Sequence, residues 1–183
     1  MMKLESSNHP WTIAHKARRL TWMLVWGLIG SPGPRFLSPW RAFLLRLFGA
    51  RIGKAPLICG RVRVLMPWNL EVGDYVAISE QVDIYNYDRV KIGDNTCISK
   101  GVWLCTGSHD FSLADFPLIW RPIIIGSSVW VAAEVLVQPG VIIEDGVVVG
   151  ARSVVKKDLS AWNVYAGNPC CFIKPRKLKG VVD

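Results

Sequence analysis

The sequence predicts a mainly β fold, a parallel β-helix built from six-residue repeats, with a helical segment before it and a short extension after it. Two observations predict this architecture: an aliphatic residue recurs every six positions between Ile52 and Val155, and glycine or asparagine recurs in the turns between these positions. A period of six fits neither an amphipathic helix nor a half-buried strand, whose periods are about 3.6 and about 2 residues. It suits short strands joined by tight turns, with three strands in each coil.

The aliphatic positions define a register for five coils, with two phase corrections and one long interruption. In coil order they are Ile52, Ile58 and Val64; Val72, Ile78 and Ile84; Ile92, Ile98 and Leu104; Ile125, Val131 and Val137; and Ile143, Val149 and Val155. All 15 hold Ile, Leu or Val, although these types make up only 53 of the 183 residues, so chance is a poor explanation. We expect equivalent positions to stack into interior ladders. Turn residues such as Gly93 and Asn95 are expected to adopt the positive φ angles that sharp corners need.

The segment before the repeats, residues 1–51, is expected to be helical and amphipathic. Its most apolar run, from Leu20 to Gly30, has 11 residues, whereas a spanning helix needs about 20. Basic residues flank this run on both sides. Two interpretations stay open: Trp22 and Trp26 contact an anionic membrane face peripherally, or the run caps the end of the main core.

The β-helix is expected over residues 52–160, with a protruding loop near 106–124 and a C-terminal extension over 161–183. The loop follows from the interruption, because the coil from Ile92 to Ile125 takes 33 residues where 18 would suffice. Long excursions from a regular scaffold are commonly functional. His109 lies at the start of this loop and is the only histidine beyond residue 15. A lone histidine is often structural, but this position makes His109 the candidate for proton transfer.

The hexads, together with the runs over 67–112, 129–159 and 166–169, resemble the hexapeptide-repeat acyltransferase superfamily. Within it they resemble the WcaF-like colanic acid and exopolysaccharide acetyltransferases, relatives of the maltose and galactoside O-acetyltransferases. The resemblance covers roughly residues 40 to 178. It implies left-handed coils, although most parallel crossovers are right-handed. It also implies a homotrimer that transfers an acetyl group from acetyl-CoA to a sugar hydroxyl in exopolysaccharide or other surface glycan synthesis.

The resemblance also implies roles for individual residues. His109 would be the general base that accepts the proton of the sugar hydroxyl. Either Asp110 or a main-chain carbonyl would hold its other ring nitrogen. The residues themselves suggest where the acceptor binds, because polar groups interrupt the apolar ladder of the neighbouring coil. The candidates for binding the acceptor are Asp83, Tyr85 and Asn86, together with Asp110 beside the histidine. The acetyl-CoA candidates are Trp130, Ala132 and Ala133 for the pantetheine arm, and Arg152, Lys156, Lys157 and Lys174 for the nucleotide phosphates.

Composition limits the alternatives. The net charge of +8 favours anionic partners, but no nucleic-acid-binding motif accompanies it. The five cysteines form no CxxC pair and no signal sequence opens the chain, so we expect reduced thiols in a cytoplasmic setting. Peripheral contact with the inner face of the membrane stays open. The γ-type carbonic anhydrases share this helix but need three histidines around zinc, and no metal is expected here. A non-catalytic trimeric scaffold stays open as an alternative, and a lipid-linked oligosaccharide would be an acceptor that explains membrane contact.

Overall fold

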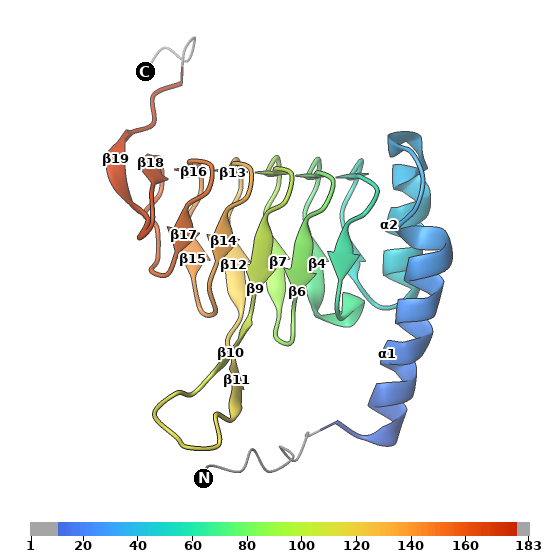
Figure 1. Cartoon of the computed structure of the whole chain (residues 1–183). Helices are drawn as coiled ribbons and strands as arrows, with labels where there is room; N and C mark the ends of the chain where they lie inside the picture. The colour runs from blue at the N-terminus through green and yellow to red at the C-terminus, as the bar shows by residue number, and fades with distance from the viewer. Residues whose placement is uncertain (1–10, 179–183) are drawn as a thin grey trace.

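A computed structural model describes residues 11–178 and shows a parallel β-solenoid with helices at its N-terminal end (Figure 1). The helices are α1 (Ile13–Val25), the π-helix η1 (Trp26–Gly30), the 3-10 helix η2 (Arg35–Leu37), α2 (Ser38–Leu47) and the 3-10 helix η3 (Pro67–Asn69). The first nine strands are β1 (Arg51–Ile52), β2 (Leu57–Ile58), β3 (Arg63–Val64), β4 (Leu70–Val72), β5 (Ala77–Ile78), β6 (Asp83–Tyr85), β7 (Val90–Ile92), β8 (Cys97–Ile98) and β9 (Trp103–Cys105). The others are β10 (Gly107–His109), β11 (Leu118–Trp120), β12 (Ile123–Ile125), β13 (Trp130–Val131), β14 (Leu136–Val137), β15 (Ile142–Ile143), β16 (Val148–Val149), β17 (Val154–Val155), β18 (Asn163–Ala166) and β19 (Cys171–Pro175).

The solenoid strands form three parallel sheets, and their register confirms the one predicted from the repeats. The first sheet has the order β1-β4-β7-β12-β15, the second contains β2-β5-β8-β13-β16-β18, and the third is β3-β6-β9-β14-β17. In the first sheet, Ile52 lies beside Val72, which lies beside Ile92. Ile92 in turn lies beside Ile125, and the aliphatic side chains of the ladders are buried except at the half-buried first position. The left-handed sense of the coils stays a prediction from the family resemblance.

Turn glycines such as Gly101 and Gly140 have the expected positive φ, but Gly93 serves a different purpose. Asn95 has the predicted positive φ, +54°, and so do side-chain-bearing residues such as Tyr75 and Ser128. Gly93 does not have a positive φ; a Cβ atom there would lie 2.6 Å from the main chain of Gly126 in the next coil. Glycine is therefore required at this position because the main chains of stacked coils approach too closely for a side chain.

The helices close the first coil, and this corrects the membrane interpretation of the two tryptophans. Trp22 and Trp26 are 1% and 5% exposed, and their rings stack with centroids 4.8 Å apart. Their indole N–H groups donate to the carbonyls of Val64 and Val62 at 2.7 and 2.8 Å. Both tryptophans therefore belong to the core, because their polar atoms are satisfied by the last strand of the first coil.

A buried arginine holds α2 and the turn before it against the solenoid. The Arg41 side chain is fully buried and donates to five carbonyls, those of Gly30, Pro32, Gly33, Pro34 and Ile58. Burial lowers the pKa of this guanidinium. Within residues 11–178, neither α1 nor α2 combines the length and the apolar run that crossing a bilayer requires.

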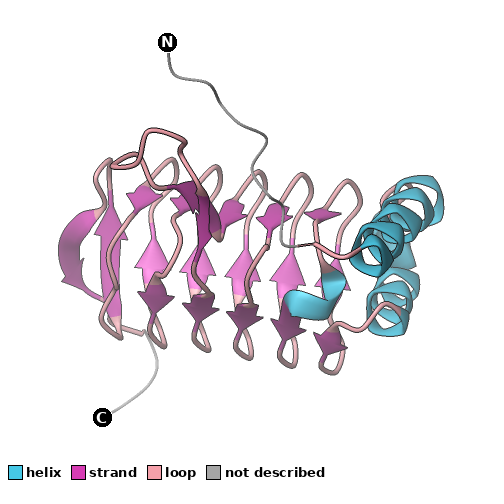
Figure 2. Cartoon of the chain, turned by 90° about the horizontal axis from the view of Figure 1, so that it is seen from below, coloured by secondary structure: helices cyan, strands magenta, loops and turns pink. Residues whose placement is uncertain are grey.

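The solenoid extends beyond residue 160, where the sequence predicted its end. Leu159 bridges to Ile143 in the first sheet, and β18 pairs in parallel with β16 in the second. Strand β19 then folds back antiparallel on β18. The predicted C-terminal extension thus begins as part of a further coil, and the hairpin β18–β19 covers the end opposite the helices (Figure 2).

Candidate active site

His109 lies on a hairpin that leaves the solenoid between β9 and β12 (Figure 1). The hairpin is formed by β10 and β11, which are antiparallel and pair His109 with Leu118. The ring of His109 is exposed, and its Nδ1 lies 2.6 Å from the carbonyl oxygen of Phe116. A carbonyl only accepts hydrogen bonds, so this contact requires a proton on Nδ1 and, in the neutral ring, leaves Nε2 as the proton acceptor. Phe116 presents that carbonyl from a left-handed conformation with φ +46°.

Asp110 does not orient the histidine. Its Oδ1 accepts hydrogen bonds from the main-chain N–H and the hydroxyl of Ser112 at 2.9 and 2.6 Å. These bonds lower the pKa of the Asp110 carboxyl, and its own N–H donates to the carbonyl of Pro117. Of the two orienting groups considered from the sequence, the structure selects the main-chain carbonyl, and Asp110 instead stabilises the tip of the hairpin.

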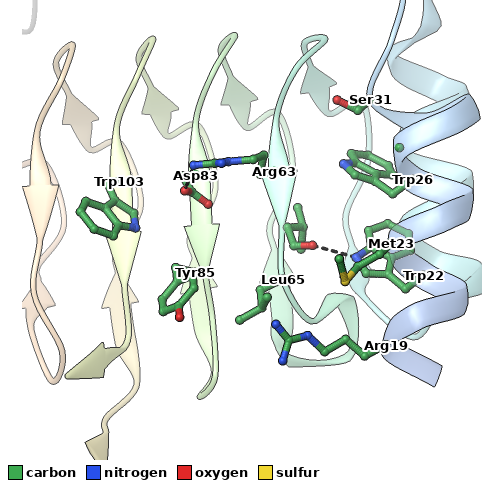
Figure 3. Close-up of a pocket in the computed structure, with 12 residues that line it drawn as sticks. Arg19, Trp22, Met23, Trp26, Ser31, Arg63, Leu65, Asp83, Tyr85 and Trp103 are labelled. Carbon is green, nitrogen blue, oxygen red and sulfur yellow. Dashed lines mark hydrogen bonds and ion pairs between the residues drawn. The ribbon is translucent and has the colours of Figure 1, made fainter. Parts of the chain in front are cut away.

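Two of the four acceptor candidates line a cavity between α1 and the third sheet. The cavity has a volume of about 650 Å³ (Figure 3). Asp83 lies on its wall and is ion-paired with Arg63. Tyr85 lies further along the same strand, and Trp22, Met23, Trp26 and Trp103 are among the apolar residues that line the cavity. The cavity therefore combines aromatic faces with an ion pair, a combination that suits a ligand with both apolar and polar parts.

A pair of tyrosines connects this cavity to the base of the hairpin. The hydroxyls of Tyr85 and Tyr87 lie 3.1 Å apart, and burial together with this contact raises the pKa of Tyr85 to about 12. A Cβ atom on Gly107, the first residue of β10, would lie 2.9 Å from the Tyr87 ring. Glycine at 107 thus lets the hairpin strand pass directly over Tyr87. No sequence motif marks Gly107 for this role, because the Tyr87 ring that requires it lies in the preceding coil.

Asn86, the third acceptor candidate, is part of the core. Its side chain is fully buried, its Oδ1 accepts from the N–H of Met66 at 3.0 Å, and its Nδ2 donates to the carbonyl of Met66 at 2.7 Å. Both ends of the amide are thereby bonded to the main chain of the preceding coil. Asn86 is not among the residues that line the cavity and it joins two coils at a turn, so the structure gives no support to its prediction as a sugar ligand.

The candidates for the pantetheine arm lie on the second sheet and at the corner that follows it. Trp130 is 49% exposed on β13, and its indole N–H donates to the hydroxyl of Ser99 at 3.0 Å. The Ala132 N–H donates to the carbonyl of Val149, and the Ala133 carbonyl accepts from the N–H of Arg152. Two of the main-chain groups expected to pair with pantetheine amides therefore bond to the next coil.

The cationic candidates are exposed, and they are distributed around the end of the solenoid that β19 covers. Arg152 follows Ala133 at the same corner and bonds Glu134 at 2.7 Å, which raises the pKa of its guanidinium. Lys156 and Lys157 follow β17, at the corner where the chain passes from the third sheet to the first. Lys174 lies on β19.

In one copy of the chain, His109 and the candidates for the pantetheine arm lie on different sides of the prism, whereas Lys156 and Lys157 lie at the corner from which the hairpin leaves. The hairpin that carries His109 leaves from the corner between the third and first sheets, after β9. Trp130 lies on the second sheet, and Ala133 lies at the corner between the second and third sheets. The third sheet therefore separates the histidine's corner from that of Ala133.

Comparison with known proteins gives a consistent result. The family model described as bacterial transferase hexapeptide (six repeats) matches residues 122–157. The chain is 46% identical over 155 residues to the putative colanic acid biosynthesis acetyltransferase WcaF of Escherichia coli (strain K12), and the match covers 85% of each. A galactoside acetyltransferase solved in complex with coenzyme A superposes with a TM-score of 0.83 at 26% identity, covering 92% of this chain and 86% of that one. The hexapeptide-repeat acetyltransferase VCA0836 from Vibrio cholerae shares the fold, with a TM-score of 0.84 at 22% identity over 96% of both chains.

Proposed function

The chain belongs to the hexapeptide-repeat acetyltransferases, and from this premise we propose that it transfers an acetyl group from acetyl-CoA to a sugar hydroxyl during surface polysaccharide synthesis. One observation carries the proposal: an exposed His109 at the base of a protruding hairpin, held through Nδ1 by a carbonyl. The relative named for colanic acid biosynthesis supports a polysaccharide acceptor. The similarity to an acetyltransferase solved with coenzyme A supports the donor.

The proposed reaction uses the free ring nitrogen of His109. A sugar hydroxyl is too weak an acid to attack a thioester at neutral pH without a base. Nε2 of the neutral ring accepts the hydroxyl proton while the oxygen forms a bond to the acetyl carbon. The C–S bond of the thioester then breaks, and the proton passes from Nε2 to the departing sulfur. The hydrogen bond to Phe116 fixes which nitrogen does this work and in which direction it points.

We propose that the complete site forms between copies of the chain, in the homotrimer that the family resemblance implies. His109 and Ala133 belong to different corners of one copy. In a closed ring of copies, each subunit presents one corner to the next. The hairpin of one copy then meets the second-sheet face of its neighbour, where Trp130, Ala132 and Ala133 would line the pantetheine arm. Arg152, Lys156, Lys157 and Lys174 are the proposed partners of the nucleotide phosphates.

For the acceptor we propose the cavity beside α1, where Asp83 and Tyr85 are the polar groups in reach. Its apolar surface suits an acceptor that carries a non-sugar part, such as a lipid-linked oligosaccharide. Such an acceptor is held in a membrane, and this favours a peripheral location of the enzyme at the bilayer surface.

The test is acetyl transfer by the purified full chain. Wild-type protein, acetyl-CoA and candidate oligosaccharides are incubated, free CoA thiol is measured, and products are identified by mass spectrometry from the mass of one added acetyl group. We expect His109→Ala to lower the rate about 100-fold or more, the range of general-base catalysis. Ser112→Ala, on the same hairpin but bonded only to Asp110, is the matched control and should keep most of the activity.

Two outcomes would contradict the proposal. Equal rates for His109→Ala and Ser112→Ala would remove His109 from the mechanism. If the wild type neither released CoA nor bound acetyl-CoA, the non-catalytic scaffold would be the better description.

A further inference from the structure

The outer side of α1 carries a stripe of exposed apolar side chains. Ile13, Leu20 and Leu24 are 87%, 58% and 56% exposed, and spacings of seven and four residues place them on one helical face. Trp22 lies two residues from both leucines, about 200° around the helix, and is buried against the solenoid. The stripe therefore points away from the solenoid. Leu28 in η1, 74% exposed, extends it.

A second stripe runs along η2 and α2. Phe36, Trp40, Phe43 and Leu47 are exposed at spacings of four, three and four, again one helical face. The rings of Trp40 and Phe43 stack with centroids 5.6 Å apart. The Trp40 indole donates to the carbonyl of Ile29 at 2.8 Å, which ties this stripe to the helical segment that contains Leu28.

Together these eight residues form what we call the end face, on the helical layer that lies at one end of the solenoid (Figure 1, Figure 2). The residues of the end face are Ile13, Leu20, Leu24, Leu28, Phe36, Trp40, Phe43 and Leu47. Single exposed apolar residues are ordinary, but a group of this size marks an interaction surface.

The segment that forms the helical layer and the first coil carries charge of a single sign, and within it Arg51 and Arg63 are ion-paired with Glu71 and Asp83 of the second coil. Between Trp11 and Leu70 the sequence contains ten Lys or Arg residues and no Asp or Glu, and all but one of the chain's 14 acidic residues follow residue 70. Eight of the ten cations are exposed: Lys16, Arg18, Arg35, Arg46, Arg51, Lys54, Arg61 and Arg63. The positive net charge of the protein is therefore concentrated on the helical layer and the first coil.

An apolar face surrounded by cationic side chains fits one kind of partner better than the others. A second copy docked on the same face would bring two cationic layers together, which costs free energy in proportion to their charge. A nucleic acid would match the charge but would leave the apolar stripes without a partner. An anionic lipid surface matches both, because acyl chains accept the apolar side chains while the headgroups neutralise the cations.

We propose that the end face docks on an anionic lipid bilayer and holds the enzyme at the surface from which a lipid-carried acceptor projects. The docking stands on the end face and its charge, and only its benefit to catalysis rests on the proposed function. The two tryptophans singled out from the sequence take no part, since both are buried.

The test is vesicle flotation of the full chain with two lipid mixtures, phosphatidylcholine alone and phosphatidylcholine with an equal amount of phosphatidylglycerol. We expect the wild type to float only with the anionic vesicles. The triple variant Leu20→Ser, Leu24→Ser, Phe43→Ser should bind the anionic vesicles at least about tenfold more weakly than the wild type. Ile173→Ser is the matched control, because Ile173 is equally exposed but lies on β19 at the opposite end; its binding should equal that of the wild type.

A second variant guards against misfolding of the triple variant. Lys16→Glu with Arg35→Glu changes only exposed charges and should also weaken binding about tenfold or more, with a loss that salt reduces. Absence of wild-type binding to anionic vesicles, or full binding by both variants, would overturn the proposal. So would a drop in assembly mass for the triple variant in light scattering, since the face would then join copies. Acetyl transfer to a soluble sugar is measured in parallel and should be unchanged, so that failure of docking is distinct from failure of the proposed function.

Discussion

The conformation of Phe116 determines whether its carbonyl reaches His109, and this can be tested with two substitutions of the same residue. A residue with a side chain incurs roughly 1–2 kcal/mol in the left-handed region, glycine incurs none, and a β-branched residue is disfavoured most. Phe116 has φ +46°. Phe116→Gly should therefore keep the carbonyl at Nδ1 of His109, whereas Phe116→Val should move the main chain out of this conformation and break the 2.6 Å contact.

The difference between the two variants gives the magnitude. The left-handed conformation costs valine roughly 1–2 kcal/mol more than it costs glycine. The population of molecules with a correctly held His109 ring should therefore be about 5- to 30-fold smaller with valine, since about 1.4 kcal/mol is a factor of ten. Both variants lose the same aromatic ring, so the comparison isolates the main chain. We expect kcat, measured by CoA release at saturating acetyl-CoA, to be lower for Phe116→Val by that factor, with similar KM values for acetyl-CoA. Equal kcat values for the two variants would refute the orienting role of the carbonyl.

Three further predictions concern stability and the acceptor. Arg41→Met should lower the free energy of unfolding by roughly 3 kcal/mol or more, because five carbonyls, two of them in buried hydrogen bonds, lose a charged donor. The control Arg46→Met, at an exposed arginine bonded to two carbonyls, should cost less in urea unfolding. Asn86→Ala should lower stability by about 1–3 kcal/mol and leave the KM for the sugar unchanged, and a raised KM with unchanged stability would restore it as an acceptor ligand. Burial and two neighbouring arginines lower the pKa of His15 below its ordinary 6.5, so the unfolded chain binds the proton more readily and stability should fall as pH drops below 6.5. His15→Phe should flatten this pH dependence in thermal unfolding. A variant with the same pH profile as the wild type would contradict the prediction.

The ladder register could be predicted from the sequence because it depends on a local and repetitive property. Each of the three strands of a coil buries one aliphatic side chain at an equivalent position, so a period of six appears directly in the residue types. The strand pairing confirms the predicted register at all 15 positions. For example, Ile52 pairs with Val72 and Val64 pairs with Ile84. The protruding hairpin could be predicted in the same way, since an interruption of the six-residue repeat has few other causes.

The surroundings of the site could not be predicted in the same way. The carbonyl of Phe116 holds His109, and a carbonyl is present at every residue, so no residue type signals it. The sequence predicts Asn86 as a ligand because a polar residue in an apolar ladder suggests binding. In the structure, bonds to the main chain of another coil satisfy its amide equally well. The apolar run does not reveal which of its side chains are exposed: in α1, Trp22 lies on the opposite face from Leu20 and Leu24, and only the two leucines are exposed.

The central claim, that the active site forms between copies of the chain, is tested most directly with mixed assemblies. His109→Ala and Trp130→Ala chains are unfolded together, refolded in equal amounts, and assayed for acetyl transfer beside each variant alone. If the histidine of one copy acts with the tryptophan face of the next, random mixing makes about one site in four complete, and activity should rise to about a quarter of the wild-type value. Activity no higher than the mean of the two separate variants would show that both residues act within one copy, and would contradict the account.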